Sequence, residues 1–416
     1  MMKVPGTILQ YPAGALKGVT DAHRWRRLYH QFVQRFQQEP LGWVSVPGRL
    51  EIGGNHTDHH QGRVIAAAVD LDMLAAFAPL QEQVLIVRSL TLNQEFSVTA
   101  PFQQPENQEK GTAAAFLRGV AAGFMARGIA IQGMVAVLDS RIPVGAGLSS
   151  SAAYAVTIAT ILNKLYAQNA LSLLELALIA RYAENQFFGK PCGLMDQMAC
   201  AFGGMILIDF KTPHSPLVKR LPHDLLSDEW QFAIIAAGGG HEKLTDHYRE
   251  IPEEMAQVAQ ALGRSVLRQI NWQEFRQHIP QLREQIGDRA VLRAWHFLEE
   301  NERVAQQARA LRSGNVSTFL QFMMESGNSS FKYLQNVVVS GNLKEQSLAV
   351  TLAACERWIR RNGGACRVHG GGFAGTVLAV IPSHKQKAFK HYIRQTIRAR
   401  EIFFPNVRPE GAVILE

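Results

Sequence analysis

The chain has 416 residues, more than the roughly 250 to 300 at which a single hydrophobic core stops growing, so its length predicts two domains. Its composition, 47% hydrophobic and 19% charged with 34 glycines, is that of a globular protein and excludes a disordered or fibrous chain. The formal net charge of +8 raises the question of a polyanionic partner. The basic residues are spread along the sequence, and the densest run, 384–400, has the spacing of an amphipathic surface helix. We therefore predict no nucleic-acid partner, and a polyanion-binding face on 384–400 is the alternative.

Signals for export or membrane insertion are weak. Residues 1–14 make a poor secretory signal because proline and glycine interrupt their short apolar stretch. The charge-free run 142–163 has the length of a membrane span, but glycines, a proline and three consecutive serines in its first half indicate a loop that enters a buried helix. The four cysteines form no CxxC pair, which is typical of reduced thiols. We expect a cytoplasmic protein with no membrane partner.

In chain order, the first half mixes helices and strands. Apolar residues at helical spacing predict a helix over 21–37, and a strand follows at 43–46. Residues 64–78 and 84–98 have the composition of strands in one sheet. Ser172 and Glu175 form a capping-box pattern. The other expected elements are a helix at 112–127, a strand at 134–138, helices at 152–166, 172–188 and 194–202, and a strand at 205–210.

The second half is predicted to be a helix-decorated antiparallel sheet. The segment 211–227 is rich in Pro, His and Ser, and we place the domain boundary there, which gives domains of residues 1–214 and 215–416. Beyond it we expect strands at 232–236 and 376–381 and a set of helices between 245 and 361.

A glycine- and serine-rich loop, PVGAGLSSSAA at 143–153, lies between a predicted strand and a long apolar helix. Free backbone amides and the helix dipole favour an anion there, and the hydroxyls of Ser149, Ser150 and Ser151 can add hydrogen bonds and a magnesium ligand. The chain contains no GxxxxGK[ST] sequence, which excludes the common P-loop. A GxGxxG pattern begins at Gly370, but a strand-like segment follows it where a dinucleotide site requires a helix. The sequence thus predicts a phosphate site of another kind at 143–153.

Four segments resemble, in order and spacing, the signature motifs of galactokinases in the GHMP superfamily of small-molecule kinases. They are PGRLEIGGNHTDHHQG (47–62), VGAGLSSSAA (144–153), CGLMDQ (192–197) and VHGGGFAG (368–375). The resemblance implies an α+β, two-domain GHMP kinase fold with the active site in the interdomain cleft. It also implies phosphorylation of the anomeric hydroxyl of galactose by ATP, with magnesium as cofactor, in a monomer or weak homo-oligomer.

The same resemblance assigns roles to individual residues. Asp196 matches the general base that takes the sugar's proton, and Arg49 matches the partner that lowers its pKa. Glu184 and Ser151 match the magnesium ligands. The expected ATP-binding residues are Gly145, Ala146, Gly147, Leu148, Ser149, Ser150 and Ser151. The expected sugar-binding residues are Asn55, His56, Thr57, Asp58 and Tyr248.

The sugar loop departs from the family pattern. Galactokinases usually have Glu where Asn55 stands, Asn where Glu51 stands and Tyr where His59 stands, and the missing Glu normally binds the hydroxyl on the sugar's sixth carbon. A neutral amide forfeits roughly 1 kcal/mol of hydrogen bonding and removes a charge that repels an acidic sugar. The alternatives are therefore a kinase for another galactose-like acceptor such as galacturonate, a catalytically silent sugar sensor, and a zinc site formed by His56, Asp58, His59 and His60.

Overall fold

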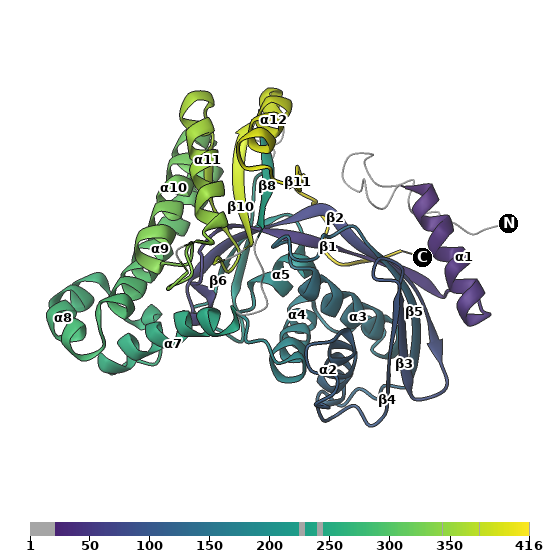
Figure 1. Ribbon diagram of the computed structural model, residues 1–416. Coiled ribbons are helices and arrows are strands. Elements are labelled where there is room, and N and C mark those ends of the chain that lie inside the picture. The colour runs from purple at the N-terminus through teal and green to yellow at the C-terminus, as the bar shows by residue number, and fades with distance from the viewer. Residues whose placement is uncertain (1–20, 224–228, 239–243, 343, 374, 416) are drawn as a thin grey trace.

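A computed structural model describes residues 21–223, 229–238, 244–342, 344–373 and 375–415 (Figure 1). In this part of the chain the first sheet has eight strands in the order β12-β1-β2-β5-β3-β4, with β6 paired to β2 and β7 paired to β6. The β3–β5 pair is parallel and the other pairs are antiparallel. The strands are β1 (Gly42–Gly53), β2 (Arg63–Leu80), β3 (Val84–Ser89), β4 (Gln94–Thr99), β5 (Gly133–Ser140), β6 (Met205–Asp209), β7 (Leu217–Leu221) and β12 (Val413–Leu415).

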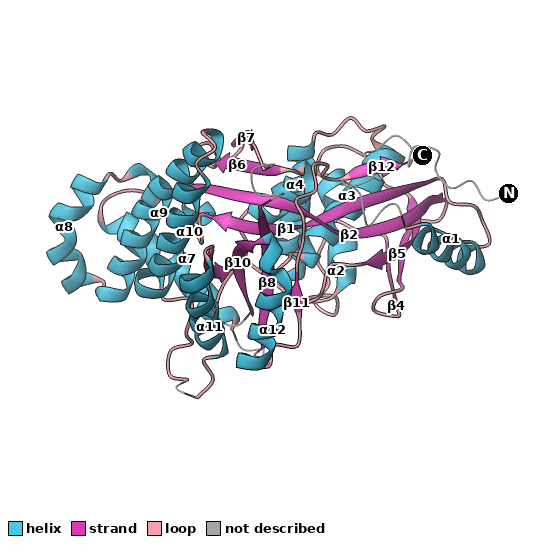
Figure 2. Cartoon of the chain, turned by 90° about the horizontal axis from the view of Figure 1, so that it is seen from above, coloured by secondary structure: helices cyan, strands magenta, loops and turns pink. Residues whose placement is uncertain are grey.

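Helices cover both faces of this sheet. One face packs against α2 (Ala113–Met125), α3 (Ser150–Tyr166), α4 (Leu173–Tyr182) and α5 (Met195–Phe202) in the largest hydrophobic cluster. The other face receives α1 (Ala22–Phe36), whose Trp25, Leu28 and Phe32 pack on Trp43 and Leu74. Because β1 and β2 are covered on both sides, β1 is buried along its full length. Figure 2 shows these two long strands running from the helices of residues 245–329 to α1.

The second sheet is antiparallel throughout, in the order β11-β8-β10-β9. Its strands are β8 (Trp230–Gly238), β9 (Ala365–His369), β10 (Gly375–Pro382) and β11 (Ile402–Phe403). Alternate residues of β10 join different cores: Val377 packs beneath α11 (Ser347–Asn362) and α12 (Gln386–Ile397), whereas Leu378 joins the core of the first sheet. A two-residue side-chain period thus lets one strand connect the two lobes.

The remaining helices form a helical lobe. They are α7 (Thr245–Ala261), α8 (Trp272–Gln285), α9 (Asp288–Arg312) and α10 (Val316–Ser329). The first two and the first half of α9 enclose a separate hydrophobic cluster, whereas α10 packs Phe319 and Met323 into the core of the first sheet. Helix α9 packs against both α7 and α10, and it also reaches β2 of the first sheet. No helix of the described residues has the length and apolar character needed to cross a membrane.

Most predicted elements are confirmed, including the helix at 21–37, the Ser172–Glu175 capping box and the antiparallel second sheet. Two expectations differ from the structure. The segment 84–98 is a hairpin of two strands, β3 and β4, rather than one strand. The division at residue 214 does not follow the sheets, because β7 pairs with β6 and β12 pairs with β1, so that both belong to the first sheet. The residue pattern within one β-strand gives no information on which other strand it pairs with.

A buried charge network fastens α1 to the first sheet. Arg24, with 4% of its side chain exposed, bonds Asp72 at 2.5 Å and Asp139 at 2.7 Å. Asp72 is fully buried and also accepts a hydrogen bond from Ser45 at 2.5 Å. The charge of Arg24 helps to hold the pKa of Asp72 below its usual value, although burial acts to raise it. Each buried charge in this network is therefore stabilised by its oppositely charged partner.

We expect Arg24→Ala to lower the free energy of unfolding by about 3 kcal/mol, because it leaves a buried carboxylate short of its main partner. Arg35→Ala on the same helix removes only an exposed pair with Glu95, so its effect should stay below about 1 kcal/mol. Urea unfolding followed by circular dichroism measures both. Equal losses for the two variants would contradict the assigned role of Arg24.

Candidate active site

Two side chains that are 147 residues apart in the chain, Arg49 and Asp196, form a two-pronged ion pair. The Nε and Nη2 atoms of Arg49 donate to the two carboxylate oxygens of Asp196 at 2.7 and 2.8 Å. Arg49 follows a register shift in the β1–β2 pairing, and Asp196 lies in the first turn of α5. Arg49 is 5% exposed, whereas Asp196 is 32% exposed, so the carboxylate is the member of the pair that a substrate can reach.

Arg49 also sets the protonation state of Asp196. Burial acts to raise the pKa of Asp196. The charge and hydrogen bonds of Arg49, together with the hydrogen bond of the Ser149 hydroxyl, lower this pKa by more than burial raises it. The Ser149 hydroxyl donates to Asp196 at 2.6 Å. The net effect holds this pKa below its ordinary value, so the carboxylate is ionised at neutral pH and able to accept a hydrogen bond or a proton.

The loop at 143–149 bends tightly over β1. Gly145, Gly147 and Ser149 have φ angles of 77°, 69° and 59°, in the left-handed region that favours glycine. The backbone amide of Arg49 donates to the Leu148 carbonyl at 3.2 Å, and its guanidinium donates to the Gly147 carbonyl. A side chain at Gly147 would lie 2.6 Å from the Thr376 hydroxyl of β10. The loop is therefore held between the first sheet and the second.

Helix α3 starts at Ser150, directly after this loop, and its first amides have no partners within the helix. Ser151 in the first turn donates its hydroxyl to Glu184 at 3.1 Å. Glu184 belongs to the π-helical turn η3 (Ala183–Phe188), which continues α4. A helix N-terminus beside a carboxylate and a hydroxyl can hold both phosphate oxygens and a cation.

Glu184 is suited to a divalent cation. Burial raises its pKa, and within the described part of the chain its one ion pair is with the exposed Lys190, whose Nζ lies 3.8 Å from Oε1. Gln197 donates to the other carboxylate oxygen at 2.7 Å and orients the group. The carboxylate of Glu184 and the hydroxyl of Ser151 supply the oxygen ligands that magnesium prefers, and phosphates and water complete such sites.

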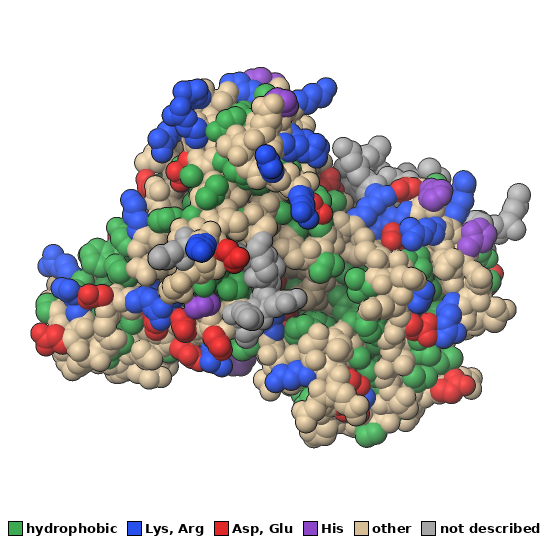
Figure 3. All heavy atoms as spheres, viewed as in Figure 1, with side chains coloured by type: hydrophobic (Ala, Val, Ile, Leu, Met, Phe, Trp, Pro, Cys, Tyr) green, Lys and Arg blue, Asp and Glu red, His purple; other side chains and the backbone are tan. Residues whose placement is uncertain are grey.

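The sugar loop brings His56 and Asp58 to the same region. A side chain at Gly193 would overlap the Asp58 carboxylate, which also accepts a 3.4 Å hydrogen bond from the Met195 amide. Nε2 of His56 lies 3.0 Å from the Gly371 carbonyl, while Nδ1 is buried without a partner in the structure. Burial lowers the pKa of His56 to about 3, so the ring is neutral. In the space-filling view the surface is hollowed between the two lobes (Figure 3).

Tyr248 of α7 closes the other side of this loop. Its hydroxyl donates to the Gly372 carbonyl at 3.0 Å, and its ring lies against Gly371. His56 and Tyr248 thus lie against the glycine turn at 370–372 and Asp58 lies against Gly193, and the free polar atoms of these side chains can read hydroxyl groups by directional hydrogen bonds.

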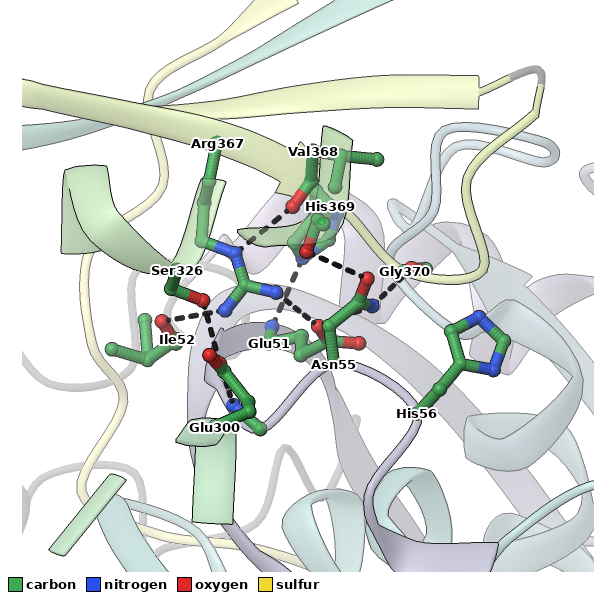
Figure 4. Close-up of polar contacts among 12 residues, drawn as sticks. Glu51, Ile52, Asn55, His56, Glu300, Ser326, Arg367, Val368, His369 and Gly370 are labelled. Atoms are coloured by element: carbon green, nitrogen blue, oxygen red, sulfur yellow. Dashed lines mark hydrogen bonds and ion pairs between the residues drawn. The ribbon is translucent and has the colours of Figure 1, made fainter. Parts of the chain in front are cut away.

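Asn55 is placed differently from its neighbours, as the close-up of Figure 4 shows. Its side chain is fully buried and its amide nitrogen donates at 2.8 Å to both Glu51 and the Gly370 carbonyl. Its amide oxygen accepts from Asn336 at 2.8 Å and Ser330 at 3.2 Å. Because an amide makes about four hydrogen bonds, protein groups use the full capacity of Asn55.

Glu51 and Arg367 complete this buried hub. Arg367 of β9 donates to Glu51 at 2.8 Å and to the Ile52 carbonyl at 3.0 Å, and both side chains are almost fully buried. Burial raises the pKa of Glu51 to about 7, and the charges of Arg367 and Arg49 oppose this rise. The Glu51 backbone amide donates to His369 at 3.0 Å. The hub therefore joins β1 of the first sheet to β9 of the second.

Comparison with known proteins identifies the family. Residues 111–204 match the model of the GHMP kinases N terminal domain, and residues 30–79 match the galactokinase galactose-binding signature. A galactokinase of Glaesserella parasuis is 30% identical over 393 residues, which cover 92% of this chain and 98% of the relative. A galactokinase of Actinobacillus pleuropneumoniae is 31% identical over 363 residues, 84% of this chain and 88% of the relative. The chain belongs to the galactokinase family.

Solved structures of other kinases share this fold. The crystal structure of Lactococcus lactis galactokinase complexed with galactose matches with a TM-score of 0.82 at 20% identity and covers 94% of this chain and 99% of that one. The Methanococcus jannaschii mevalonate kinase matches with a TM-score of 0.62 at 15% identity, over 88% and 98% of the two chains. The expected GHMP kinase fold and the expected class, an ATP-dependent sugar kinase, are confirmed.

The galactokinase-family site gathers most of the predicted residues, but not all of them face it. Asp196, Arg49, Glu184 and the loop 145–151 lie together. The Asn55 and Thr57 side chains instead point into the protein, and Thr57 bonds the Gly54 and Arg63 carbonyls at 2.9 and 2.7 Å. The expectation that these two side chains bind the sugar is therefore not supported.

The zinc alternative also lacks support. Across the described residues, no group of three or more His, Cys, Asp or Glu side chains is arranged to hold a metal ion. The side chain of His60 instead lies near the Pro252 carbonyl and the Leu267 amide. No pattern in the sequence pointed to Arg367 and Asn336, although Arg367 directly precedes the glycine motif at 368–375.

Removing Arg49 should shift the pH dependence of the reaction. Without its charge the pKa of Asp196 rises, because burial is no longer opposed, and the carboxylate becomes protonated at a higher pH. We therefore expect the acidic limb of kcat/KM in Arg49→Gln to move to higher pH, beyond any loss of rate. Ser149→Ala, which removes one hydrogen bond, should give a smaller shift in the same direction. Direct ADP detection across pH measures both, and an unmoved acidic limb in Arg49→Gln would refute this electrostatic role.

Proposed function

We propose that the protein transfers the terminal phosphoryl group of ATP to the anomeric hydroxyl of galactose, forming galactose 1-phosphate. The observation that carries the proposal is the ionised Asp196, which Arg49 and Ser149 hold beside the phosphate loop. Phosphoryl transfer demands little covalent chemistry of a protein, so positioning and charge provide most of the catalysis. A fixed carboxylate, a fixed guanidinium and a helix N-terminus meet these demands.

In this mechanism Asp196 accepts the proton of the anomeric hydroxyl as the oxygen attacks the phosphorus and the bond to the leaving ADP breaks. Arg49 keeps the carboxylate ionised and places a positive charge near the transferring group. The amides at the start of α3 and the hydroxyls of Ser149, Ser150 and Ser151 bind phosphate oxygens. Asp58, His56 and Tyr248 orient the sugar so that one hydroxyl faces Asp196.

Magnesium fits as the cofactor, with the hydroxyl of Ser151 and the carboxylate of Glu184 as its ligands. When bound, it neutralises phosphate charge. Gln197 fixes one oxygen of Glu184 and leaves the other directed toward Ser151. The four cysteines are free thiols, which supports a reducing, cytoplasmic location.

The hydrogen bonds of Asn55, which are all made to protein groups, favour a second candidate for the acceptor sugar. Four protein groups use its hydrogen bonds, and the nearby carboxylate of Glu51 is paired with Arg367. No carboxylate at position 55 then faces the sixth carbon of the sugar, and an acceptor that carries a carboxylate there, such as galacturonate, meets less repulsion. Galacturonate is therefore our second candidate acceptor.

Asp196→Asn should lower kcat by about 100- to 10,000-fold, the usual contribution of a general base, because an amide does not take the proton. Sugar affinity should stay near wild type, since the two side chains have the same shape. Asp70→Asn is the matched control. The Asp70 side chain lies away from the site, where it accepts a hydrogen bond from Asn406, so this variant should leave kcat unchanged. An ADP-release assay with calorimetry of sugar binding tests this, and near-normal turnover of Asp196→Asn would refute the base.

A panel of galactose, galacturonate and related sugars identifies the acceptor. We expect turnover with galactose. We expect the exchange variant E51N/N55E to leave kcat/KM for both sugars within about twofold of wild type, because it keeps one carboxylate and one amide in the buried hub and neither then faces the sugar. The single variant Asn55→Glu is the control, because it crowds two carboxylates beside Arg367 and should lose stability.

Each other outcome has a distinct meaning. Turnover with galacturonate but not galactose would overturn the first acceptor and keep the kinase. Binding of sugar and ATP without ADP release would instead identify the silent sensor.

A further inference from the structure

Basic residues occur throughout the chain, but the net positive charge of the protein is concentrated in one segment. Residues 347–401 contain ten Lys or Arg and two Glu, so this segment carries the whole formal charge of +8 and the rest of the chain is neutral. One of the ten, Arg367, is buried in the hub with Glu51. The remaining nine are exposed or half-buried: Arg357, Arg360, Arg361, Lys385, Lys387, Lys390, Arg394, Arg398 and Arg400.

The fold brings these nine cations onto one surface. Helices α11 and α12 lie side by side on the second sheet, and Trp358 and Phe389 join them with ring centroids 4.9 Å apart. Nζ of Lys385 donates to the Asn362 side chain at 3.2 Å, so the end of α11 meets the start of α12. Figure 3 shows Lys and Arg side chains gathered over this upper lobe. We call these nine side chains the basic face.

The basic face differs from an ordinary solvated helix surface. On α7, Arg249 is paired with Asp246 at 3.0 Å and Glu253 at 3.3 Å. On the basic face, by contrast, the described residues include one ion pair, a 3.8 Å contact between Arg360 and Glu356. Uncompensated cations repel one another, and their field attracts a polyanion.

The geometry favours a phosphate backbone over a lipid surface. A helix that lies on a membrane inserts an apolar face, but Phe389 and Ile393 of α12 are fully buried in the protein core. Six of the nine cations are arginines, whose planar forks match phosphate oxygens. The 12 residues of α12 extend about 18 Å, the rise of about five phosphates of one strand.

We propose that the basic face of α11 and α12 binds the phosphate backbone of nucleic acid without reading its sequence. The face is separate from the phosphate loop and from Asp196, so binding does not depend on the kinase reaction. It reverses the prediction from the sequence, in which the cations of 384–400 were assigned to a solvated surface helix.

The test uses the full chain and a fluorescein-labelled oligonucleotide, single-stranded and duplex, in fluorescence anisotropy. Saturating ATP and magnesium are present so that the oligonucleotide does not bind through the phosphate loop. We expect binding at micromolar protein in about 50 mM salt that weakens steeply with salt, at about 0.9 log units per decade for each phosphate neutralised.

The variant R361E/R394E/R398E reverses three exposed cations of the basic face and should weaken binding at least tenfold, while sugar-kinase turnover stays at wild-type level. The control R26E/R27E/R276E makes the same charge change at exposed positions outside the basic face and should bind within about twofold of wild type. Equal loss in both variants, or no binding by the wild type at low salt, would overturn the proposal. If the protein sediments with phosphatidylserine vesicles and does not bind the oligonucleotide, the basic face is instead assigned to a membrane surface.

Discussion

The ion pair between Arg49 and Asp196 is the contact on which the arrangement of the site depends. It joins β1 to α5, and the same guanidinium holds the Gly147 carbonyl of the phosphate loop. Because Arg49 is almost fully buried, loss of any partner leaves a charge without compensation, which is costly in a protein interior. Three segments far apart in sequence are therefore fixed relative to one another, and the carboxylate is both ionised and exposed.

A second constraint acts on the acceptor side, where the two sheets meet. The buried hub needs one carboxylate and one amide beside Arg367, and in this chain Glu51 supplies the carboxylate and Asn55 the amide. The side chain that holds the lobes together is thereby unavailable to the sugar. In the proposed function, acceptor selection falls instead to His56 and Tyr248, which contact the glycine turn at 370–372, and to Asp58, which contacts the start of α5.

Local signals in the sequence predicted the elements that local physics determines. The capping box at Ser172, the helix of 21–37 and the phosphate loop all lie where their patterns indicate. Motif spacing also predicted the grouping of Arg49, Ser149 and Asp196. The motif did not indicate that the side chains of Asn55 and Thr57 point into the protein, because a motif identifies neighbours along the chain, whereas burial decides which way each side chain points.

The sequence by itself determined the kinase class, since catalysis of phosphoryl transfer needs a small set of groups that the four motifs carry. Tertiary structure alone decided how β7 and β12 pair, which polar residues the interface between the sheets uses, and that the cations of α11 and α12 share one surface. The physical reason is the same in each case. Strand pairing, burial and electrostatic fields depend on distances between residues that are remote in sequence, such as Trp358 with Phe389 and Asn55 with Asn336, and only the folded chain fixes those distances.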